Sequence, residues 1–474
     1  MLVIRRISLL LISALLLYGS ECFSCHVVNP CEPPVFPVNP CDPPIIEVDP
    51  IVISIPNGKL NPTFGSGGAV VTELNFPGGS QNHINAIGFQ LTNTGRLVMT
   101  GTAGNVPSTL IVAGFRPTGI LDTSFNPPIG YNISPVPRTV AKALAINTNQ
   151  EIVITGNAIV SPFDRPFLLV FKYTPIGTGP EDNVLAINGK EIIDRSSIPA
   201  GTIFQNIIGN ACASQKSNNR IVVAGYYTIA GKNHNLIAKL TNEVKFDPTF
   251  ATDGIQAEFM IPGSSSSQIN GVTIQDDGKI VVVGMAVING RERAFVARLN
   301  ANGSLDFSFN HPFGYKLLDW DGNASANAVV IKPATPEKIV IVGQSTLHGI
   351  TSAVYQILNY SDGSNLVGPV FISPSTNVKT LEFNAIATDP TAASISYITG
   401  TQTLNSGKKN FFCSRLIGNA IDTSFSPTGY VTIDFIGYNA IANGVTVRPD
   451  GSPVIGGYVQ RDNDTLYAMA CLRP

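Results

Sequence analysis

The chain has 474 residues, of which 13% are charged and 44% are hydrophobic, with 44 glycines and 34 prolines. Its net charge of −2, with both signs scattered along the sequence, excludes the basic footprint of a nucleic-acid-binding protein. Alternating runs of valine, isoleucine and threonine between glycine, asparagine and proline are typical of short strands and tight turns. We therefore expect an all-β protein.

The N-terminus has the layout of a secretory signal peptide. Arg5 and Arg6 precede an apolar run over residues 7–18, and small or polar residues begin at Gly19. This run is shorter than a membrane-spanning helix needs, whereas it suits the hydrophobic part of a signal peptide. We expect cleavage after Ser24, a signal peptide over residues 1–24, and an exported chain that is periplasmic, secreted or at a bacterial cell surface. No later apolar stretch is long enough to predict a transmembrane segment.

Two other interpretations of this region stay open. A lipid anchor on Cys25 or Cys22 is the alternative to free secretion, although the residues before each cysteine match a lipidation site poorly. The stretch "CFSCH", which ends at His26, also matches the attachment pattern of a c-type haem. Cleavage after Ser24 would separate its two cysteines, so we favour the processing site and expect no cofactor.

Residues 25–55 form a proline-rich linker in which the phrase "VNPCEPP" returns as "VNPCDPP". Proline at this density disfavours helix and favours an extended, semi-rigid spacer. Cys31 and Cys41, one in each copy, can form a disulfide in an oxidising compartment. The cysteines beyond the linker fall in expected strands, where a buried free thiol is the common state: Cys212, Cys413 and Cys471.

Two sequence markers repeat through residues 56–474. The first is a phrase such as "ILDTSF", "KFDPTF" or "SLDFSF", which recurs at nearly regular intervals, at Asn61, Asp122, Asp182, Asp247, Asp306, Asn365 and Asp422. The copies at Asp182 and Asn365 are degenerate. The second is an apolar strand that ends in glycine, at Gly101, Gly156, Gly225, Gly284, Gly343, Gly400 and Gly457. Two markers with seven copies each predict seven structural units.

The unit that begins at Ile269 has the pattern of four strands. Its expected order is "INGVTIQ", the turn "DDG", "KIVVVGMAV", the loop "NGRER", "AFVARLN", the turn "ANGS" and the outer strand "LDFSFNHPFGYKLL". Gly278 and Gly303 stand where hairpin turns need a positive φ. One such unit cannot bury both of its faces, but radially stacked units can. We therefore expect a seven-bladed β-propeller, with four antiparallel strands per blade, over residues 56–474.

The repeated phrase has a structural interpretation within this fold. Its aspartate or asparagine can accept a hydrogen bond from a nearby backbone N–H and fix the turn, and the serine or threonine supplements that bond. The phenylalanines then bury their rings between neighbouring blades: Phe64, Phe125, Phe250, Phe309 and Phe425. We favour this role over any contact with a ligand.

"LDTSF", "DDGKIVVVG" and "FVARLNANG" together resemble the delta-60 β-propeller repeat of bacterial exported and surface proteins. The resemblance extends over residues 56–474 and is weaker at "PEDNVLAING" and "GSNLVGPVF". It implies a repeat architecture and an exported bacterial protein. The family has no agreed catalytic residues, so the resemblance implies no active site.

An asparagine stands near the start of most expected inner strands, and a lysine takes its place in the second unit. Radial symmetry predicts a ring of these residues at one mouth of the central channel: Asn85, Lys142, Asn206, Asn270, Asn327, Asn384 and Asn443. We interpret the amides mainly as hydrogen-bond donors to the backbone of the adjacent blade, which would fix the register between blades. The alternative is a polar ring that holds water, an ion or a ligand.

The loops after the glycine-ended strands and those that enter the inner strands emerge on one face. We expect them to vary in length, and variable loops on a rigid scaffold are the usual site of binding. This loop face carries His83, Arg138, Asp164, Arg165, Lys232, His234, Arg291, Arg293, Asp319, Asp321, Lys408, Lys409 and Arg461. A rim of mixed charge suits a protein or a glycan rather than a membrane or a nucleic acid.

The sequence lacks the short motifs that carry common catalytic chemistry, such as G-x-S-x-G, H-E-x-x-H and a phosphate-binding glycine loop. Its five histidines are scattered, and "DWDGN" has calcium-loop spacing at Asp319, Asp321 and Asn323 but lacks the rest of that pattern. We expect no metal site. The favoured function is a non-catalytic binding scaffold, and the alternative is a secreted hydrolase or lyase with carboxylates at the channel mouth.

Overall fold

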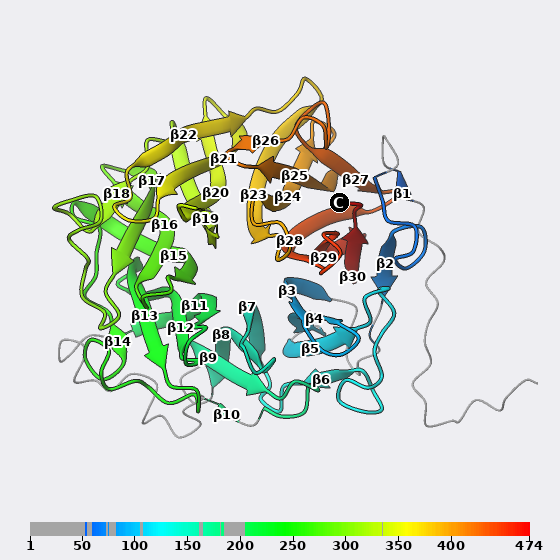
Figure 1. Ribbon diagram of the computed structural model, residues 1–474, viewed down its shortest axis with the longest axis horizontal. Coiled ribbons are helices and arrows are strands. Elements are labelled where there is room, and N and C mark those ends of the chain that lie inside the picture. Colours follow the sequence, from blue (N-terminus) through cyan, green and yellow to red (C-terminus); the bar gives the residue numbers. More distant parts are fainter. Residues whose placement is uncertain are drawn as a thin grey trace, which may run out of the picture. The chain divides into compact units, whose positions relative to one another are not determined.

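Antiparallel sheets surround a central opening in the computed structural model of the chain (Figure 1). The structure describes residues 53–54, 59–72, 74, 82–104, 108–160, 165–180, 182–183, 204–333 and 335–474, all within the compact unit Ile45–Pro474. These residues form strands and turns, so the all-β class is confirmed, and they include no helix that could cross a membrane. The predicted signal peptide, Cys31 and Cys41 lie outside the described residues.

Four sheets are each built from four consecutive strands. The first contains β3 (His83–Gln90), β4 (Arg96–Ala103), β5 (Thr109–Phe115) and β6 (Tyr131–Ile133). The second contains β7 (Thr139–Ile146), β8 (Ile152–Val160), β9 (Arg165–Tyr173) and β10 (Asp182–Asn183). The third contains β11 (Phe204–Ser214), β12 (Ile221–Ile229), β13 (Lys232–Leu240) and β14 (Ile255–Gln256). The fourth contains β15 (Ser264–Ile274), β16 (Ile280–Ile288), β17 (Arg291–Leu299) and β18 (Tyr315–Leu317).

A fifth four-stranded sheet joins the two ends of the described chain. It contains β28 (Asn439–Val447), β29 (Pro453–Arg461), β30 (Asp464–Cys471) and, as its outer strand, β2 (Ala69–Thr72). Ala69 pairs with Ala470 and Thr72 pairs with Tyr467. The sheet is therefore complete only when residues from both ends of the chain have come together.

The remaining strands form one ten-stranded sheet with two parts. One part contains β19 (Asn323–Lys332), β20 (Lys338–Leu347), β21 (Ile350–Asn359) and β22 (Asn365–Ile372). The other contains β23 (Val378–Thr388), β24 (Ile395–Leu404), β25 (Lys409–Ile417), β26 (Ala420–Ile421), β27 (Val431–Phe435) and β1 (Ile53–Ser54). A single parallel bridge, Thr351 to Thr380, joins the parts. Ile53, which precedes the predicted start of the propeller at residue 56, pairs with Phe435.

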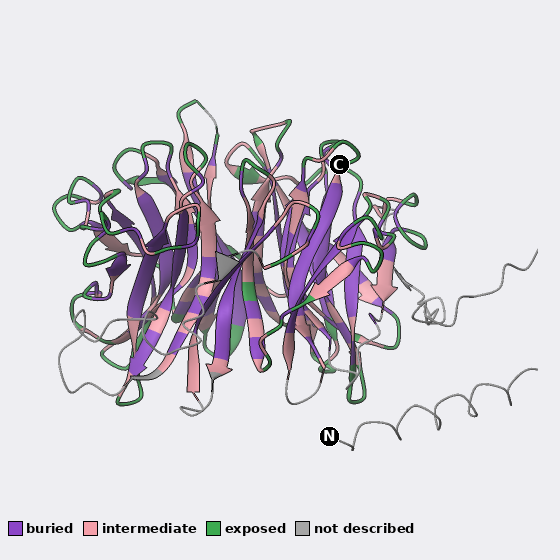
Figure 2. Ribbon diagram, turned by 90° about the horizontal axis from the view of Figure 1, so that it is seen from below, coloured by how far each residue is buried: buried purple, intermediate pink, exposed green. Residues whose placement is uncertain are grey.

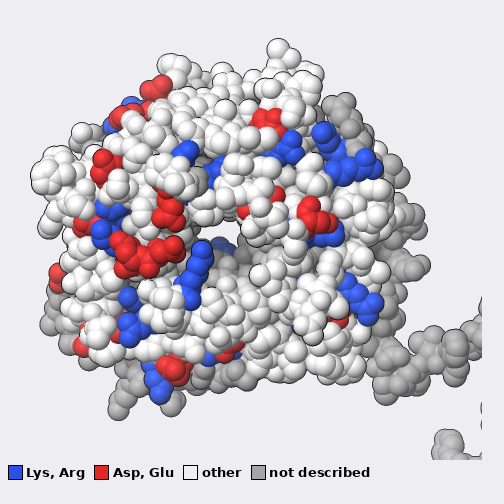
Figure 3. All heavy atoms as spheres, viewed as in Figure 1, with Lys and Arg blue, Asp and Glu red and all other residues white. Residues whose placement is uncertain are grey.

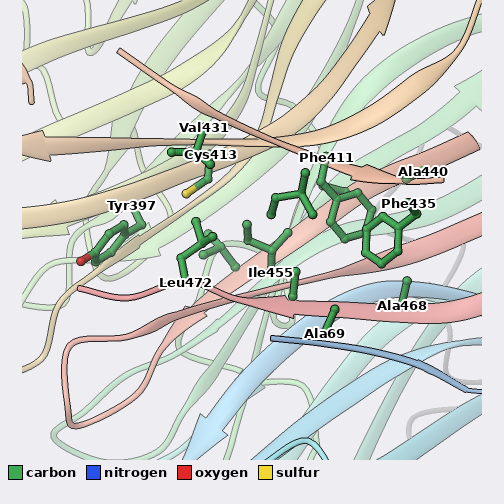
Figure 4. Close-up of a cluster of buried hydrophobic side chains, with 14 of the residues drawn as sticks. Ala69, Tyr397, Phe411, Cys413, Val431, Phe435, Ala440, Ile455, Ala468 and Leu472 are labelled. Carbon is green, nitrogen blue, oxygen red and sulfur yellow. The ribbon is translucent and has the colours of Figure 1, made fainter. Parts of the chain in front are cut away.

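The apolar core lies between sheets. Figure 2 shows buried positions along the strands and exposed positions in the loops at both ends. In the cluster of Figure 4, Phe411 and Phe435 from the β23–β27 part pack against Ile455, Ala468 and Ala69 from the last sheet. Each sheet thus depends on its neighbours to remove its apolar faces from water.

The well-preserved copies of the repeated phrase form turns rather than strand, whereas the degenerate copies at Asp182 and Asn365 lie in β10 and β22. Asp306 Oδ1 accepts hydrogen bonds from the backbone N–H (3.0 Å) and hydroxyl (2.6 Å) of Ser308, as predicted. The predicted outer strand "LDFSFNHPFGYKLL" is wrong in extent, because β18 covers only Tyr315–Leu317. The loop "NGRER" is also shorter than expected, because only Asn289 and Gly290 separate β16 from β17.

The phenylalanines of the phrase are core residues, as predicted. All five of them are at most 1% exposed: Phe64, Phe125, Phe250, Phe309 and Phe425. The ring of Phe309 lies against Gly363 of the following strand group, where a Cβ would come within 2.4 Å of the ring. The next residue, Asn310, donates its backbone N–H to the carbonyl of Asp362 (2.7 Å). The phrase therefore packs against the next group of strands in the chain and forms a hydrogen bond with it.

A buried arginine forms an ion pair with the aspartate of the repeated phrase. Arg298 donates from Nε to Asp306 Oδ2 (2.7 Å) and from a terminal nitrogen to the carbonyl of Tyr360 (2.6 Å) in the next strand group. Burial opposes ionisation of Asp306, but the hydrogen bonds from Ser308 and the nearby Arg298 outweigh it and lower its pKa to about 2. Pairs of the same kind join Arg96 to Asp122 and Arg415 to Asp422.

The second marker is explained by β-bulges in the inner strands. Each marker glycine pairs with the residue just before a bulge, as Gly343 pairs with Ala326. A Cβ on Gly343 would stand 2.0 Å from the carbonyl oxygen of Ser325, and the other six glycines face a carbonyl oxygen at 1.7–2.0 Å. Only glycine fits there. The strands do not end at the glycine, however, since β20 continues to Leu347.

Candidate functional site

The inner-strand bulges place a ring of polar side chains around the channel. Six of the seven bulged residues opposite the marker glycines are asparagines, and each donates Nδ2 to a carbonyl of the next inner strand at 2.7–3.1 Å: Asn85 to Ala141, Asn210 to Ile269, Asn270 to Ala326, Asn327 to Phe383, Asn384 to Ala442 and Asn443 to Ile84. A β-bulge leaves its extra residue unpaired, so the side chain is free to reach the neighbouring strand. These bonds agree with a role in inter-sheet register.

One member of the predicted ring is wrong. Asn206 pairs with Thr228 just after a first register shift in β11, whereas the bulge opposite the marker glycine Gly225 falls at Asn210. A signal for Asn210 is present in the sequence, because every bulged residue stands at a nearly constant distance before its marker glycine and is followed by alanine or glycine. Asn206 lies too far ahead of its marker glycine, Gly225, and is followed by isoleucine.

Lys142 is the exception in the ring. It occupies the bulge of β7, is exposed, and its amine makes no hydrogen bond or ion pair with the described residues. Elsewhere the ring is reinforced by Ser325, which accepts from Asn270 Nδ2 (3.1 Å) and donates to Asn327 Oδ1 (2.9 Å). Figure 3 shows the central opening with both basic and acidic side chains near its rim.

The predicted loop-face residues lie at strand ends or in connections that the antiparallel order places on one face. Lys232, Arg291 and Lys409 begin third strands, and Arg461 ends β29. The expectation of variable loops fails for four of the connections between second and third strands. These are two-residue turns, at 230–231, 289–290, 348–349 and 462–463. Asp164 lies outside the described residues.

Lys408 and Arg461 share a pocket of about 540 Å³ on this face. It lies between the turn that joins β24 to β25 and the turn that joins β29 to β30, with Tyr438, Gln460 and Asp462 also in its wall. Lys408 Nζ pairs with Asp434 at 2.5 Å. The guanidinium of Arg461 lies over the ring of Tyr438, 4.9 Å from its centroid.

The other predicted face residues are dispersed around the rim. His83 packs against Tyr458 and His234 stacks on Tyr227, and burial lowers the pKa of both histidines. Arg291 Nε donates to the carbonyl of Gly322 (2.6 Å). The rest have separate positions on the face: Arg138 before β7, Arg165 over Phe167, Arg293 within β17, and Asp319 and Asp321 before β19.

Sequence patterns did not predict the uncharged wall of this pocket or a second pocket on the opposite face. Tyr438 stands in a connection, "IGYN", where a large aromatic residue is itself a signal of a contact surface. The opposite-face pocket, of about 370 Å³, includes Phe89 and Arg448. There Arg448 is paired with Asp450 at 2.9 Å.

Chemically reactive groups are sparse among the described residues. No three histidine, cysteine, aspartate or glutamate side chains in the described ranges are grouped as metal ligands would be. Cys413 and Cys471 are buried free thiols and Cys212 is a half-buried one. Glu382, two residues before the ring member Asn384, is half-buried, and burial raises its pKa.

A family model described as "Domain of unknown function (DUF5122) beta-propeller" matches residues 216–250 and 275–309. Each match begins in the turn before a second strand and ends at the phrase phenylalanine, Phe250 or Phe309. The predicted β-propeller fold is supported by this match and by the radial arrangement of the sheets (Figure 1). A comparison with curated protein sequences finds no match.

Several solved structures are similar at low identity. Drosophila Semaphorin 2a has a TM-score of 0.44 and 7% identity, over 84% of this chain and 74% of its own. Sqt1 from Chaetomium thermophilum has a TM-score of 0.40 and 11% identity, over 84% of this chain and 97% of its own. A Trypanosoma rangeli sialidase in complex with sialic acid has a TM-score of 0.39 and 10% identity, over 85% of this chain and 59% of its own. Similarities this low carry no functional argument.

Proposed function

We propose that the protein is an exported, non-catalytic β-propeller that binds a protein or a glycan through its loop face. The observation that carries the proposal is the pocket that contains Lys408 and Arg461. A concave site of about 540 Å³ has the size of small-ligand pockets in general. Its wall combines cations, a carboxylate, amides and one aromatic ring, which suits a polar partner.

The proposed scaffold has seven blades of four strands. The seven marker glycines, each opposite a bulge of an inner strand, support this number. The ten-stranded sheet divides naturally at the single bridge between Thr351 and Thr380 into two blades. Membership of the delta-60 repeat family is part of the same proposal and is supported by "DDGKIVVVG" and the related repeats.

Export is proposed from the N-terminal sequence alone. Arg5, Arg6 and the apolar run over residues 7–18 support a signal peptide that is cleaved after Ser24. Mass spectrometry of the chain made in a bacterial host, with its N-terminus intact, tests this. A mature product that begins at Cys25 and carries no lipid is expected. A full-length cytoplasmic product would contradict export, and a lipid-sized mass increment would favour anchoring.

The binding proposal is tested with the mature protein on a glycan array and in pull-downs from surface extracts of the source cells. Lys408→Ala/Arg461→Ala is expected to remove the retained ligand, and Arg448→Ala on the opposite face is the matched control. All three residues have exposed or partly exposed side chains, so the fold should persist. Greater loss of binding in Arg448→Ala would show that the wrong face was chosen.

A hydrolase or lyase remains the second candidate, and one observation favours it. Glu382 lies on the inner strand β23, two residues before Asn384, and burial raises its pKa, as occurs in a carboxyl that serves as a general acid. Activity on polysaccharides that is abolished by Glu382→Gln, with an unchanged melting temperature, would establish this function. Full activity in that variant would remove the only carboxyl on which the candidate rests.

A further inference from the structure

We infer that the pocket between the β24–β25 and β29–β30 turns binds a uronate residue of an acidic glycan, with Arg461 as the carboxylate ligand. This inference rests on the proposed function and narrows its ligand to one class. It is carried by the charge, orientation and surroundings of three side chains in the pocket wall.

Arg461 is an exposed cation that is held in place but not neutralised. No carboxylate among the described residues lies within ion-pair distance of its guanidinium, and none of them hydrogen-bonds to it. The ring of Tyr438, 4.9 Å away, supports one face of the guanidinium. The N–H edge is therefore available, and two parallel N–H groups match the two oxygens of a carboxylate.

The other cations that line the two pockets are already paired. Lys408 contacts Asp434 at 2.5 Å, and Arg448 of the opposite-face pocket contacts Asp450 at 2.9 Å. An ion pair of this kind offers little net charge to an incoming anion. Arg461 is thus the residue through which this pocket attracts negative charge.

The rest of the wall favours a sugar over an acidic peptide. Asp462, beside Arg461, makes no ion pair with the described residues and can accept hydrogen bonds. The carboxylate of an acidic peptide side chain has no hydroxyl group beside it that could donate a hydrogen bond to Asp462. A uronate brings hydroxyl donors on the same ring as its carboxylate, so it can satisfy Arg461, Asp462 and the amide of Gln460 together.

The test compares the binding of a charged oligosaccharide with that of its uncharged methyl ester. Isothermal titration of the mature protein uses trigalacturonate, its trimethyl ester, a glucuronate-containing trisaccharide and tetraglutamate. We expect at least one of the two acidic sugars to bind about tenfold or more tightly than the ester, as loss of a charge-assisted contact implies. Arg461→Gln should remove that difference and leave ester binding unchanged, while Arg461→Lys restores part of it. Arg448→Gln is the control on the opposite face.

Each outcome separates the inference from the function on which it rests. Equal binding of acid and ester, or no binding of either acidic sugar, overturns the uronate site. Tetraglutamate that binds as tightly as the acidic sugar overturns the glycan class. In these cases the proposal that the loop face binds a partner is still supported if Lys408→Ala/Arg461→Ala no longer binds a ligand found on the glycan array or in the pull-downs. If the double variant still binds every such ligand, both the uronate site and the loop-face proposal are wrong.

Discussion

Phe307 and Phe309 stand two residues apart in one phrase, yet their environments are opposite. The Phe307 ring is 60% exposed, whereas Phe309 is fully buried beneath Arg298, whose guanidinium lies 4.8 Å from the ring centroid. The turn that Asp306 and Ser308 fix directs one ring outward and the other into the space between strand groups. The recurrence of the second phenylalanine in the phrase follows from this burial.

We therefore expect Phe309→Ala to lower the free energy of unfolding by about 3–5 kcal/mol, because it empties a closed aromatic site. Phe307→Ala is the matched control and should change it by less than about 0.5 kcal/mol. Urea denaturation followed by intrinsic fluorescence measures both. A loss below about 1 kcal/mol for Phe309→Ala would mean that the repeated phenylalanine is not a core residue.

Asp306 makes stability depend on acidity. Its pKa is about 2 in the folded protein and about 3.9 in an unfolded chain, so folding favours its ionised form. Its contribution is fully present above about pH 4 and is lost as the pH falls toward 2. Asp122 and Asp422 act in the same direction, because their pKa values are also lowered.

Asp306→Asn should consequently flatten part of the fall in melting temperature between pH 4 and pH 2. At pH 7 it should cost about 3 kcal/mol, because it leaves the buried Arg298 without its carboxylate. Thermal melts across this pH range test the prediction, with the exposed Asp277→Asn as control. A pH profile identical to that of the unchanged protein would assign the acid sensitivity to other groups.

At the scale of the element, each bulge and the glycine opposite it depend on each other structurally. The bulge of β19 turns the carbonyl of Ser325 toward Gly343, and it leaves Asn327 free to bond Phe383 of the next inner strand. The two features that repeat in the sequence, the asparagine and the glycine, therefore belong to the same local geometry, although Lys142 replaces the asparagine in β7.

Gly343→Ala is expected to lower the free energy of unfolding by about 2–3 kcal/mol, because its methyl group would overlap a backbone carbonyl. Gly368→Ala on β22 is the control, since a Cβ there meets no atom within 4 Å. Chemical denaturation of both variants decides the matter. Equal stabilities would show that the bulge can move aside at little cost.

Repeat spacing was sufficient to predict the strand groups but not their limits. "LDFSF" alternates apolar and polar residues as a strand does, so the sequence pattern hides the turn that Asp306 and Ser308 make. Asn206 lies near the start of an inner strand and so fits the predicted ring, but the spacing to Gly225 and the alanine that follows identify Asn210 as the bulged residue. The pocket at Arg461 joins two turns from different strand groups, and no local pattern predicts such a meeting.

At the scale of the whole molecule, β2 closes the circle of sheets around the central opening. This strand pairs along β30, and Leu60 forms a further bridge with Leu472. Buried residues from the N-terminal segment, Phe64 and Ala69, complete the cores on either side of the last sheet. Without the segment, the last sheet would expose its outer edge and part of both cores.

A chain that begins at Asn82 should therefore lack a single cooperative melt and should bind a hydrophobic dye. A chain that begins at Ile45 is the control and should melt as the full chain does. Differential scanning calorimetry distinguishes the two. An Asn82 chain with an unchanged transition would show that closure by β2 adds no stability.

The pairing of β2 with β30 also affects the order in which the sheets form during folding. Ala69 must find Ala470, a partner near the opposite end of the chain, so this pairing is among the most distant in the molecule. Contacts so remote in sequence form slowly, because a long loop must close before any of them adds stability. Earlier sheets can form as the chain emerges, but β2 has no partner strand until β30 has been synthesised. We therefore expect the pairing of β2 with β30 to be a late and slow step, and a chain without this pairing keeps an open edge that chaperones can recognise.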